Sequence, residues 1–287
     1  MSEKTPKFGF SDDQLAKLTN VYKKDLFNEK VILVSGGGSG IGKAIASLFA
    51  RLGAHIVICG RKQEKLDAGV EYLKQFGGEV TAYQTDIRDA DGVNQLFDSI
   101  WAQYGRLDVL INNAGGQFPQ AAIDYSHKGW KAVITTNLNG TFYMMQSAAK
   151  HWRDNKQSGN IINIVADIWR GMPGVAHTCA ARAGVIYLSK TVAVEWAPYN
   201  IQVNCVAPGA IESSGMEVYP PEEQKKFFLS NPMKVMGDVH DIAQACVYLA
   251  APSGKFINGE VLNVEGGSML WGDVWPAGKP DYFKQGA

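Results

Sequence analysis

The chain has 287 residues, with 28 basic and 28 acidic side chains and a formal net charge of zero. This length suits one large α/β domain or two small ones, and the balanced charge without a basic stripe argues against nucleic acid as a partner. No apolar run approaches the ~20 residues that a membrane-spanning helix needs, and the first residues lack the apolar core of a secretory signal. The four cysteines are scattered without C-x-x-C spacing, so we expect a reducing, cytoplasmic location and no metal site.

The first 29 residues are polar and form an expected N-terminal extension, with a short helical pattern over residues 12–22. The β-branched run 31–34 follows and is typical of a buried parallel strand. Apolar residues then recur at helical spacing over residues 41–52, which predicts a helix with one apolar face.

A glycine-rich turn, SGGGSGIG at residues 35–42, joins this strand to this helix. Glycine permits positive φ and lets the backbone approach a ligand that a Cβ would exclude, while the first N–H groups of a helix attract anions. The spacing is G-x-x-x-G-x-G (Gly36, Gly40, Gly42), which differs from the common G-x-G-x-x-G dinucleotide fingerprint. The turn predicts a bound phosphate, and the alternative is a glycine-rich βα turn without a ligand.

Further apolar strand candidates alternate with helical patterns along the rest of the chain. They lie at residues 55–59, 80–83, 109–111, 161–165, 202–206 and 261–264. This alternation predicts a single α/β domain at residues 30–267, a doubly wound Rossmann fold with a seven-stranded parallel sheet and helices on both faces. Residues 212–237 are expected to form a substrate lid, and the aromatic tail at 268–287 is expected to pack on its own subunit or on a neighbour.

The second strand leads into Gly60-Arg61-Lys62, with no carboxylate at its end. In dinucleotide-binding folds an acidic residue at this place binds the ribose 2′-hydroxyl of NAD, whereas an arginine accommodates the 2′-phosphate of NADP. The segment therefore favours NADP(H), and the alternative is that both cations only face solvent at a helix start.

Four later motifs follow predicted elements in a definite order: Asp86-Ile87, Asn112-Asn113-Ala114-Gly115, Asn137 and Pro208-Gly209. Together with the glycine turn they resemble the short-chain dehydrogenase/reductase family over nearly the whole chain. The resemblance implies that Asp86 and Ile87 lie against the adenine and that the segment from Pro208 to Ile211 faces the nicotinamide. It implies a cofactor site made of Gly36, Ser39, Gly40, Ile41, Gly42, Arg61, Lys62, Asp86, Ile87, Asn113, Ala114, Gly115, Arg182, Pro208, Gly209 and Ile211.

The chain departs from the family at its catalytic signature. Typical members carry Tyr-x-x-x-Lys on the helix after the fifth strand and a serine at the end of that strand. Here Thr178 stands for the tyrosine and Arg182 for the lysine, and the strand ends in Val165-Ala166-Asp167. The sequence of this region resembles the peroxisomal trans-2-enoyl-CoA reductase branch and bacterial citronellol/citronellal dehydrogenase-like proteins.

These substitutions favour conjugate reduction over carbonyl reduction. Threonine is a far weaker acid than the tyrosine it replaces, and arginine stays protonated, so Thr178 is a poor proton donor to a ketone oxygen. Reduction of an enoyl thioester mainly requires donors that stabilise an enolate oxygen. We expect Thr178 to donate there and Arg182 to hold the cofactor ribose and supply positive potential. Asn137 matches a family residue that interrupts a helix and holds a water, and its alternative role is a buried amide satisfied by backbone.

Other polar residues have both a catalytic and a structural interpretation. His177 has an unperturbed pKa near ~6.5 and is a candidate proton donor. Neighbouring helical residues point about 100° apart, however, so His177 and Thr178 are not expected on the same helix face, and the alternative for His177 is a helix-start or packing role. Asp167 acts as an acid or base if buried, or hydrogen-bonds the following loop. Tyr187 and Lys190 are spaced by three and are expected at an interface or on the surface.

Three functions remain open at this level. The first is an NADP(H)-dependent reductase of an enoyl-CoA-type C=C; the second is an NAD(P)-dependent dehydrogenase of an alcohol or aldehyde such as a terpenoid; the third is a cofactor-binding protein with little chemistry. The apolar residues of the expected lid suit a fatty acyl or terpenoid chain but are also needed to pack the lid. The family resemblance implies a homotetramer assembled through helices at about residues 128–152 and 177–197.

Overall fold

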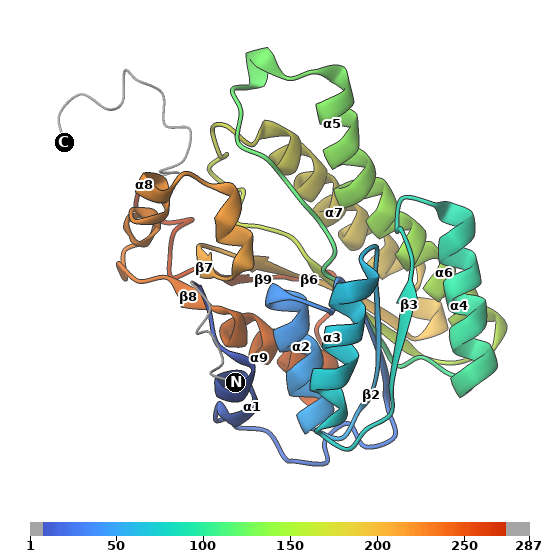
Figure 1. The fold of residues 1–287 in the computed structure, drawn as a ribbon. Helices are drawn as coiled ribbons and strands as arrows, with labels where there is room; N and C mark the ends of the chain where they lie inside the picture. The colour runs from blue at the N-terminus through green and yellow to red at the C-terminus, as the bar shows by residue number, and fades with distance from the viewer. Residues whose placement is uncertain (1–7, 274–287) are drawn as a thin grey trace.

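The computed structural model of the chain describes residues 8–273 (Figure 1). Its centre is one sheet in the order β3-β2-β1-β4-β5-β6-β9, in which every neighbouring pair is parallel. The strands are β1 Val31–Ser35, β2 His55–Gly60, β3 Val80–Gln84, β4 Val109–Asn112, β5 Gly159–Ile164, β6 Ile201–Pro208 and β9 Val261–Val264. The predicted seven-stranded parallel sheet is confirmed, with ends that differ by one or two residues from the sequence pattern.

Helices cover both faces of this sheet, as predicted for a doubly wound Rossmann-type domain. The main ones are α2 Gly40–Arg51, α3 Gln63–Lys74, α4 Ala90–Tyr104, α6 Gly140–Asp154, α7 Ala176–Glu195 and α9 Val239–Ala250. Ile32 and Val34 of β1 belong to one core cluster with α2, α3 and α9, whereas Val31 and Leu33 belong to another with α4, α6 and α7. Because successive strand side chains point to opposite faces, one continuous apolar run supplies both cores.

The long helix predicted at residues 128–152 contains an irregularity at its middle. It consists of α5 His127–Ile134, a π-helical segment Thr135–Asn139 and α6, which begins at Gly140. A Cβ on Gly140 would lie 2.8 Å from the Ile87 side chain, so this helix passes very close to the loop between β3 and α4. The π segment contains Asn137, at the position where the family resemblance implies a break in helix geometry.

The segment before β1 packs onto the α2 and α9 face of the domain. Its helix α1, Asp12–Lys17, is shorter than the 12–22 pattern because Leu18 already has extended backbone angles. Phe27 is buried with its ring 4.8 Å from that of Phe49, and the Tyr22 hydroxyl donates to the Gln244 carbonyl at 2.8 Å. Apolar anchors therefore hold a segment whose composition is mainly polar.

The segment between β6 and α9 forms a small layer over the sheet edge (Figure 1). Its elements are β7 Ile211–Glu212, the 3₁₀ turns Ser214–Val218 and Phe227–Ser230, α8 Pro221–Gln224, and β8 Gly237–Asp238, which pairs with β7. Met216, Tyr219 and Phe227 form its own buried cluster. We call residues 212–237 the lid. Most of the predicted aromatic tail, residues 274–287, lies outside the described residues.

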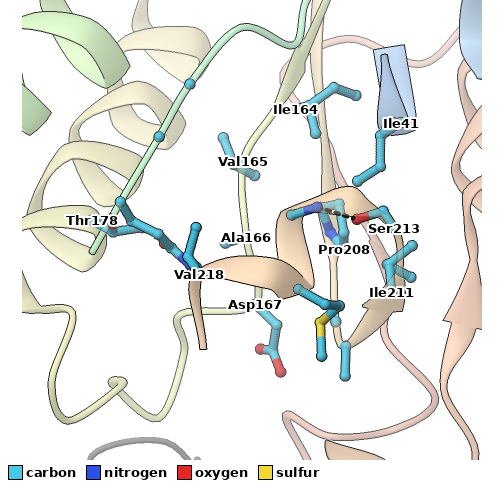
Figure 2. A pocket seen from close by; sticks show the side chains of 18 of the residues that line it. Ile41, Ile164, Val165, Ala166, Asp167, Thr178, Pro208, Ile211, Ser213 and Val218 are labelled. Carbon is cyan, nitrogen blue, oxygen red and sulfur yellow. Dashed lines mark hydrogen bonds between the residues drawn. The ribbon is translucent and has the colours of Figure 1, made fainter. Parts of the chain in front are cut away.

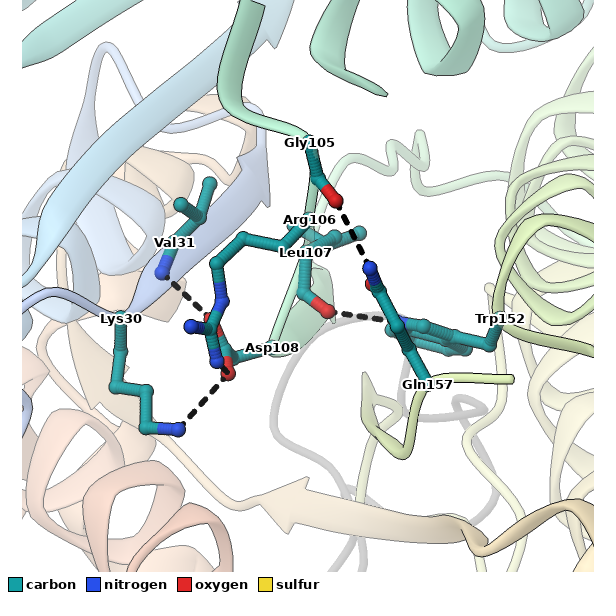
Figure 3. A network of polar contacts seen from close by, with 8 residues as sticks. All are labelled: Lys30, Val31, Gly105, Arg106, Leu107, Asp108, Trp152 and Gln157. Carbon is teal, nitrogen blue, oxygen red and sulfur yellow. Dashed lines mark hydrogen bonds and ion pairs between the residues drawn. The ribbon is translucent and has the colours of Figure 1, made fainter. Parts of the chain in front are cut away.

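Asp108, the residue before β4, ties the amino end of β4 to that of β1 (Figure 3). Its carboxylate accepts from the Val31 backbone N–H at 2.9 Å, from Lys30 Nζ at 3.1 Å and from Arg106 Nε at 2.9 Å. The buried Trp152 indole beside it donates to the Leu107 carbonyl at 2.6 Å. These contacts align the starts of β1 and β4, whose opposite ends carry the glycine turn and the Asn-Ala-Gly turn.

Short 3₁₀ turns at Ala122–Asp124, Ala197–Tyr199 and Pro252–Gly254 complete the connections. Within residues 8–273, none of the helices has both the length and the apolarity required to cross a membrane.

Candidate functional site

A cavity of about 470 Å³ opens at the carboxyl ends of β1, β4, β5 and β6 (Figure 2). It lies where the strand order reverses between β1 and β4, which is the ligand site of open α/β sheets. The lining contains most of the predicted site residues: Gly36, Ser39, Gly40, Ile41, Asn113, Ala114, Gly115, Asn137, Thr178, Arg182, Pro208, Gly209 and Ile211.

The glycine turn has the backbone that a phosphate site requires. Gly36 and Gly40 have φ of +69° and +53°, a region that side-chain-bearing residues rarely adopt. A Cβ on Gly42 would lie 2.4 Å from the Gly36 carbonyl oxygen, so helix α2 packs tightly on the turn. Ser39 precedes α2 without capping it through its side chain, which leaves the first N–H groups of the helix available to an anion.

Ser35 joins the glycine turn to the turn after β4. Its hydroxyl accepts from the backbone N–H groups of Asn113 and Ala114, each at 3.0 Å, and the Asn113 side chain donates to the Ser35 carbonyl at 3.0 Å. Ser35 was not among the predicted site residues, although it is the first residue of the glycine turn. These bonds hold the glycine turn against the turn after β4, although the two are separated by almost 80 residues.

Asn137, Gly115 and Arg182 meet at the back of the cavity. The Asn137 amide accepts from the Gly116 N–H at 3.0 Å and donates to the Gly116 carbonyl at 2.9 Å. A Cβ on Gly115 would lie only 2.3 Å from Arg182 Nη2, so the guanidinium rests directly on this turn. The backbone-satisfied role that the sequence left open for Asn137 therefore describes its contacts in this structure.

Thr178 and Arg182 lie one turn apart on α7, and both face the cavity. The Thr178 side chain is 2% exposed, and its hydroxyl has no hydrogen-bond partner among the described residues. Arg182 is 8% exposed, and burial lowers the pKa of its guanidinium to about 10, so it remains cationic at neutral pH. A buried hydroxyl without a partner costs free energy, which suits a group that meets a ligand.

Asp167 follows β5 and also lines the cavity, next to Ala166 at the family's serine position. Its carboxylate accepts a hydrogen bond from the hydroxyl of Ser268, a residue about 100 positions away. Burial, with a further contribution from the Glu265 carboxylate, raises the pKa of Asp167 above its ordinary value. The hydrogen bond expected to the following loop comes from the Trp169 backbone, and the contact with Ser268, after β9, is an additional one that the sequence did not predict.

His177 points away from the cavity and has the packing role. Its ring stacks on Tyr125 with centroids 4.6 Å apart and meets the Phe118 ring edge-on at 4.6 Å. Its Nδ1 accepts from the Thr178 N–H at 2.7 Å, and burial lowers its pKa. Tyr187 is 70% exposed on the outer side of α7.

The residues predicted for the adenine end lie outside the cavity. Arg61 and Lys62 are exposed at the end of β2, and Ile87 is buried. The Arg88 guanidinium donates three hydrogen bonds to the Asp86 carboxylate, two from Nε at 2.9 and 3.0 Å and one from Nη2, and this pair lowers the pKa of Asp86. Arg88, two residues after Asp86, was not among the predicted site residues.

The lid contributes several residues to the cavity lining, whereas the sequence predicted only that residues 212–237 form a lid. The Tyr219 hydroxyl accepts a hydrogen bond from the Gln117 amide, which joins the lid to the turn after β4. Arg170 donates to the carbonyls of Ser268 and Gly272, each at 3.1 Å, which joins the loop after β5 to the segment after β9. The contacts of Tyr219 and Arg170 join segments about 100 residues apart, so no local sequence pattern predicts them.

Comparisons with known proteins agree with this architecture. A family model described as enoyl-(acyl carrier protein) reductase matches residues 36–269. A probable 2,4-dienoyl-CoA reductase [(2E)-enoyl-CoA-producing] of Bacillus subtilis is 39% identical over 247 residues, which are 84% of this chain and 97% of that protein.

Two solved structures are similar over almost their whole length. A short chain dehydrogenase from Bacillus anthracis is 42% identical with a TM-score of 0.81, covering 86% of this chain and 98% of that one. The citronellol catabolism dehydrogenase of Pseudomonas aeruginosa is 34% identical with a TM-score of 0.77, covering 87% and 99%. The fold, the motif order and these similarities lead to one conclusion: the chain is an oxidoreductase that belongs to the short-chain dehydrogenase/reductase family, whose members use NAD(P)(H).

Proposed function

We propose that the protein is an NADP(H)-dependent reductase that saturates a conjugated C=C bond of an enoyl-CoA-type thioester. The observation that carries this proposal is the buried Thr178 hydroxyl, which lines the cavity without a hydrogen-bond partner among the described residues. The family's tyrosine stands at this position, and threonine is suited to donate a hydrogen bond rather than to release a proton. The similarity to a dienoyl-CoA reductase supports the same class of substrate.

The residues present fit the dinucleotide. The positive-φ glycines and the uncapped start of α2 suit the pyrophosphate, and Arg61 and Lys62 suit a 2′-phosphate. Arg182, which rests against the Gly115 turn, would hold the ribose. When bound, the reduced nicotinamide supplies the hydride. The chain's own contribution is to hold the thioester so that its C=C faces the segment from Pro208 to Ile211.

Hydride addition at Cβ moves negative charge onto the thioester oxygen. The Thr178 hydroxyl would donate to this oxygen, and the guanidinium of Arg182, one helical turn away, would add positive potential. Both side chains are buried, so each interaction is stronger than it would be in water. The apolar lid residues Met216 and Phe227 line the same cavity and suit an acyl chain.

The direct test follows NADPH absorbance with purified protein and a panel of enoyl-CoA esters, dienoyl-CoA esters, aldehydes and alcohols. We expect turnover of the conjugated thioesters. In the Thr178→Val variant, kcat should fall by about 10²–10³, the typical effect of one lost oxyanion donor, while NADPH affinity stays the same. Thr178→Ser keeps the hydroxyl and should retain most of the activity.

Similarity to the citronellol catabolism dehydrogenase favours a second candidate, an NAD(P)-dependent dehydrogenase of an alcohol or aldehyde such as a terpenoid. Turnover of aldehydes or alcohols without turnover of enoyl esters would establish that function and exclude the first. Absence of any turnover with intact NADPH binding would leave a cofactor-binding protein with little chemistry.

A further inference from the structure

Conjugate reduction needs an acid as well as an oxyanion donor, because the enolate carbon must receive a proton. Among the described residues, Asp167 contributes the one carboxyl group to the cavity lining. Figure 2 shows the loop of Val165, Ala166 and Asp167 running between Thr178 and the segment that holds Pro208 and Ile211. This loop therefore lies between the two groups of residues that would contact the substrate and the nicotinamide.

The other ionisable groups of the lining are less suited to this task. Burial raises the pKa of Tyr219 to about 12, and the pKa of Arg182 is about 10, so neither releases a proton readily at neutral pH. Thr178 is a weaker acid still. The imidazole of His177 stacks on Tyr125, meets Phe118 edge-on and is not part of the lining.

The surroundings of Asp167 hold its carboxyl group in place. Its backbone N–H donates to the Pro208 carbonyl at 2.9 Å, so the loop is fixed to the end of β6. Ser268 donates a hydrogen bond to its carboxylate, and the Glu265 carboxylate lies close enough to oppose its ionisation. Arg170, the nearby cation, has Nη1 directed at two backbone carbonyls, those of Ser268 and Gly272. Burial and the Glu265 carboxylate raise the pKa of Asp167, whereas Ser268, the Trp169 backbone and Arg170 lower it, and the net direction is upward.

We propose that Asp167 is the catalytic acid that protonates the α-carbon of the substrate. This inference rests on the proposed function. After hydride addition the enolate π pair forms the new Cα–H bond, the O–H bond of Asp167 breaks, and its electron pair stays on the carboxylate. The thioester C=O re-forms, and water that enters the open cavity returns one proton to Asp167. Each turnover thus consumes one hydride and one solvent proton.

Ser268 and Glu265 are positioning residues for this acid, and they act on it with opposite sign. The Ser268 hydrogen bond stabilises the carboxylate, so Ser268→Ala should raise the pKa of Asp167. The Glu265 charge opposes the carboxylate, so Glu265→Gln should lower that pKa. Because the protonated form is the active one, kcat should fall as pH rises through the pKa of Asp167.

The first test compares wild type with Asp167→Asn, using crotonyl-CoA and NADPH in D₂O. We expect kcat to fall by about 10²–10⁴, the range for a lost general acid, with unchanged NADPH affinity by fluorescence and an unchanged circular dichroism spectrum. Wild type should place deuterium on one face of Cα, whereas residual product of the variant should carry it on both faces. A variant with wild-type kcat and one-face labelling would overturn the proposal.

The second test measures the pH dependence of kcat in Ser268→Ala and Glu265→Gln. The alkaline limb should move to higher pH in the first variant and to lower pH in the second. Titration of ¹³C-labelled carboxyl groups in the cofactor-free proteins, with the Asp167 signal assigned by its loss in Asp167→Asn, should show the same two shifts. A purely structural role predicts loss of activity in both variants without opposite shifts, and that result would contradict the proposal.

The outcomes separate this inference from the proposed function. If wild type reduces no conjugated thioester, the proposed function fails before Asp167 is tested. If wild type reduces crotonyl-CoA and Asp167→Asn does so equally well on one face, the function stands and the inference is wrong. A large loss in Tyr219→Phe together with no loss in Asp167→Asn would assign the proton to the lid tyrosine instead.

Discussion

We propose that one residue position, the end of β2, determines which cofactor the protein prefers. Gly60 occupies it, and a Cβ there would meet only Leu66, at an ordinary 3.7 Å. A Cβ is thus tolerated at this position, where the chain has glycine. Arg88 binds Asp86, the carboxylate after the adjacent strand, and Arg61 also lowers the pKa of that carboxylate. Arg61 and Lys62 bring positive charge to this edge of the sheet.

Replacement of Arg61 tests this arrangement. Arg61→Ala should raise the Kd for NADPH by about 10- to 100-fold, the equivalent of one charge-assisted hydrogen bond, because it removes a partner of the 2′-phosphate. The Kd for NADH should change little. The control is Lys74→Ala, which removes an exposed cation from the last turn of α3, the helix that follows Arg61. Fluorescence titration measures both constants, and equal weakening for the two cofactors would contradict the assignment.

At the scale of elements, the glycine turn and the π-helical segment shape the cavity through close backbone approach. Gly42 packs on the Gly36 carbonyl, and Gly115 packs on Arg182. The sequence predicted the first contact zone because glycines cluster visibly between a strand and a helix. It named Gly115 and Arg182 separately, as cofactor residues that the family resemblance implies, and did not predict their contact, because the approach of α7 to the turn after β4 depends on how the helices pack.

Gly42→Ala tests the tight packing of α2 on the turn. The new Cβ would lie 2.4 Å from the Gly36 oxygen and 2.5 Å from Asn113 Nδ2, so the turn must shift. We expect a loss of about 1–3 kcal/mol in the free energy of unfolding, the range for overpacking, together with weaker NADPH binding. Gly60→Ala, with only the 3.7 Å contact, should cost much less. Urea denaturation of the two variants gives the comparison, and equal losses would refute the argument.

At the scale of the whole molecule, the outer side of α7 remains open. Tyr187 and Val194, two turns apart on this helix, are 70% and 77% exposed. Large apolar side chains in such a row often mark an interface. Together with the family resemblance, this leads us to propose that the protein forms a homotetramer.

Charge on this face should weaken assembly. Wild type should have four times the 31.3 kDa chain mass by light scattering, and the double variant Tyr187→Glu, Val194→Glu should have a smaller mass with unchanged secondary structure. Lys190→Glu changes charge on the same helix without removing an apolar contact and should have a smaller effect. A wild-type protein that is monomeric at all concentrations would exclude the tetramer.

The sequence by itself determined the layers of this protein: seven parallel strands, helices on both faces, and a glycine turn at a helix start. These features are local, since strand runs, helical periodicity and glycine conformations depend on neighbouring residues. The tertiary structure decided which side chains meet. Asp167 with Ser268, Gln117 with Tyr219, and Gly115 with Arg182 join segments roughly 70 to 100 residues apart. Sheet order and loop packing bring these partners together, and no local pattern encodes either one.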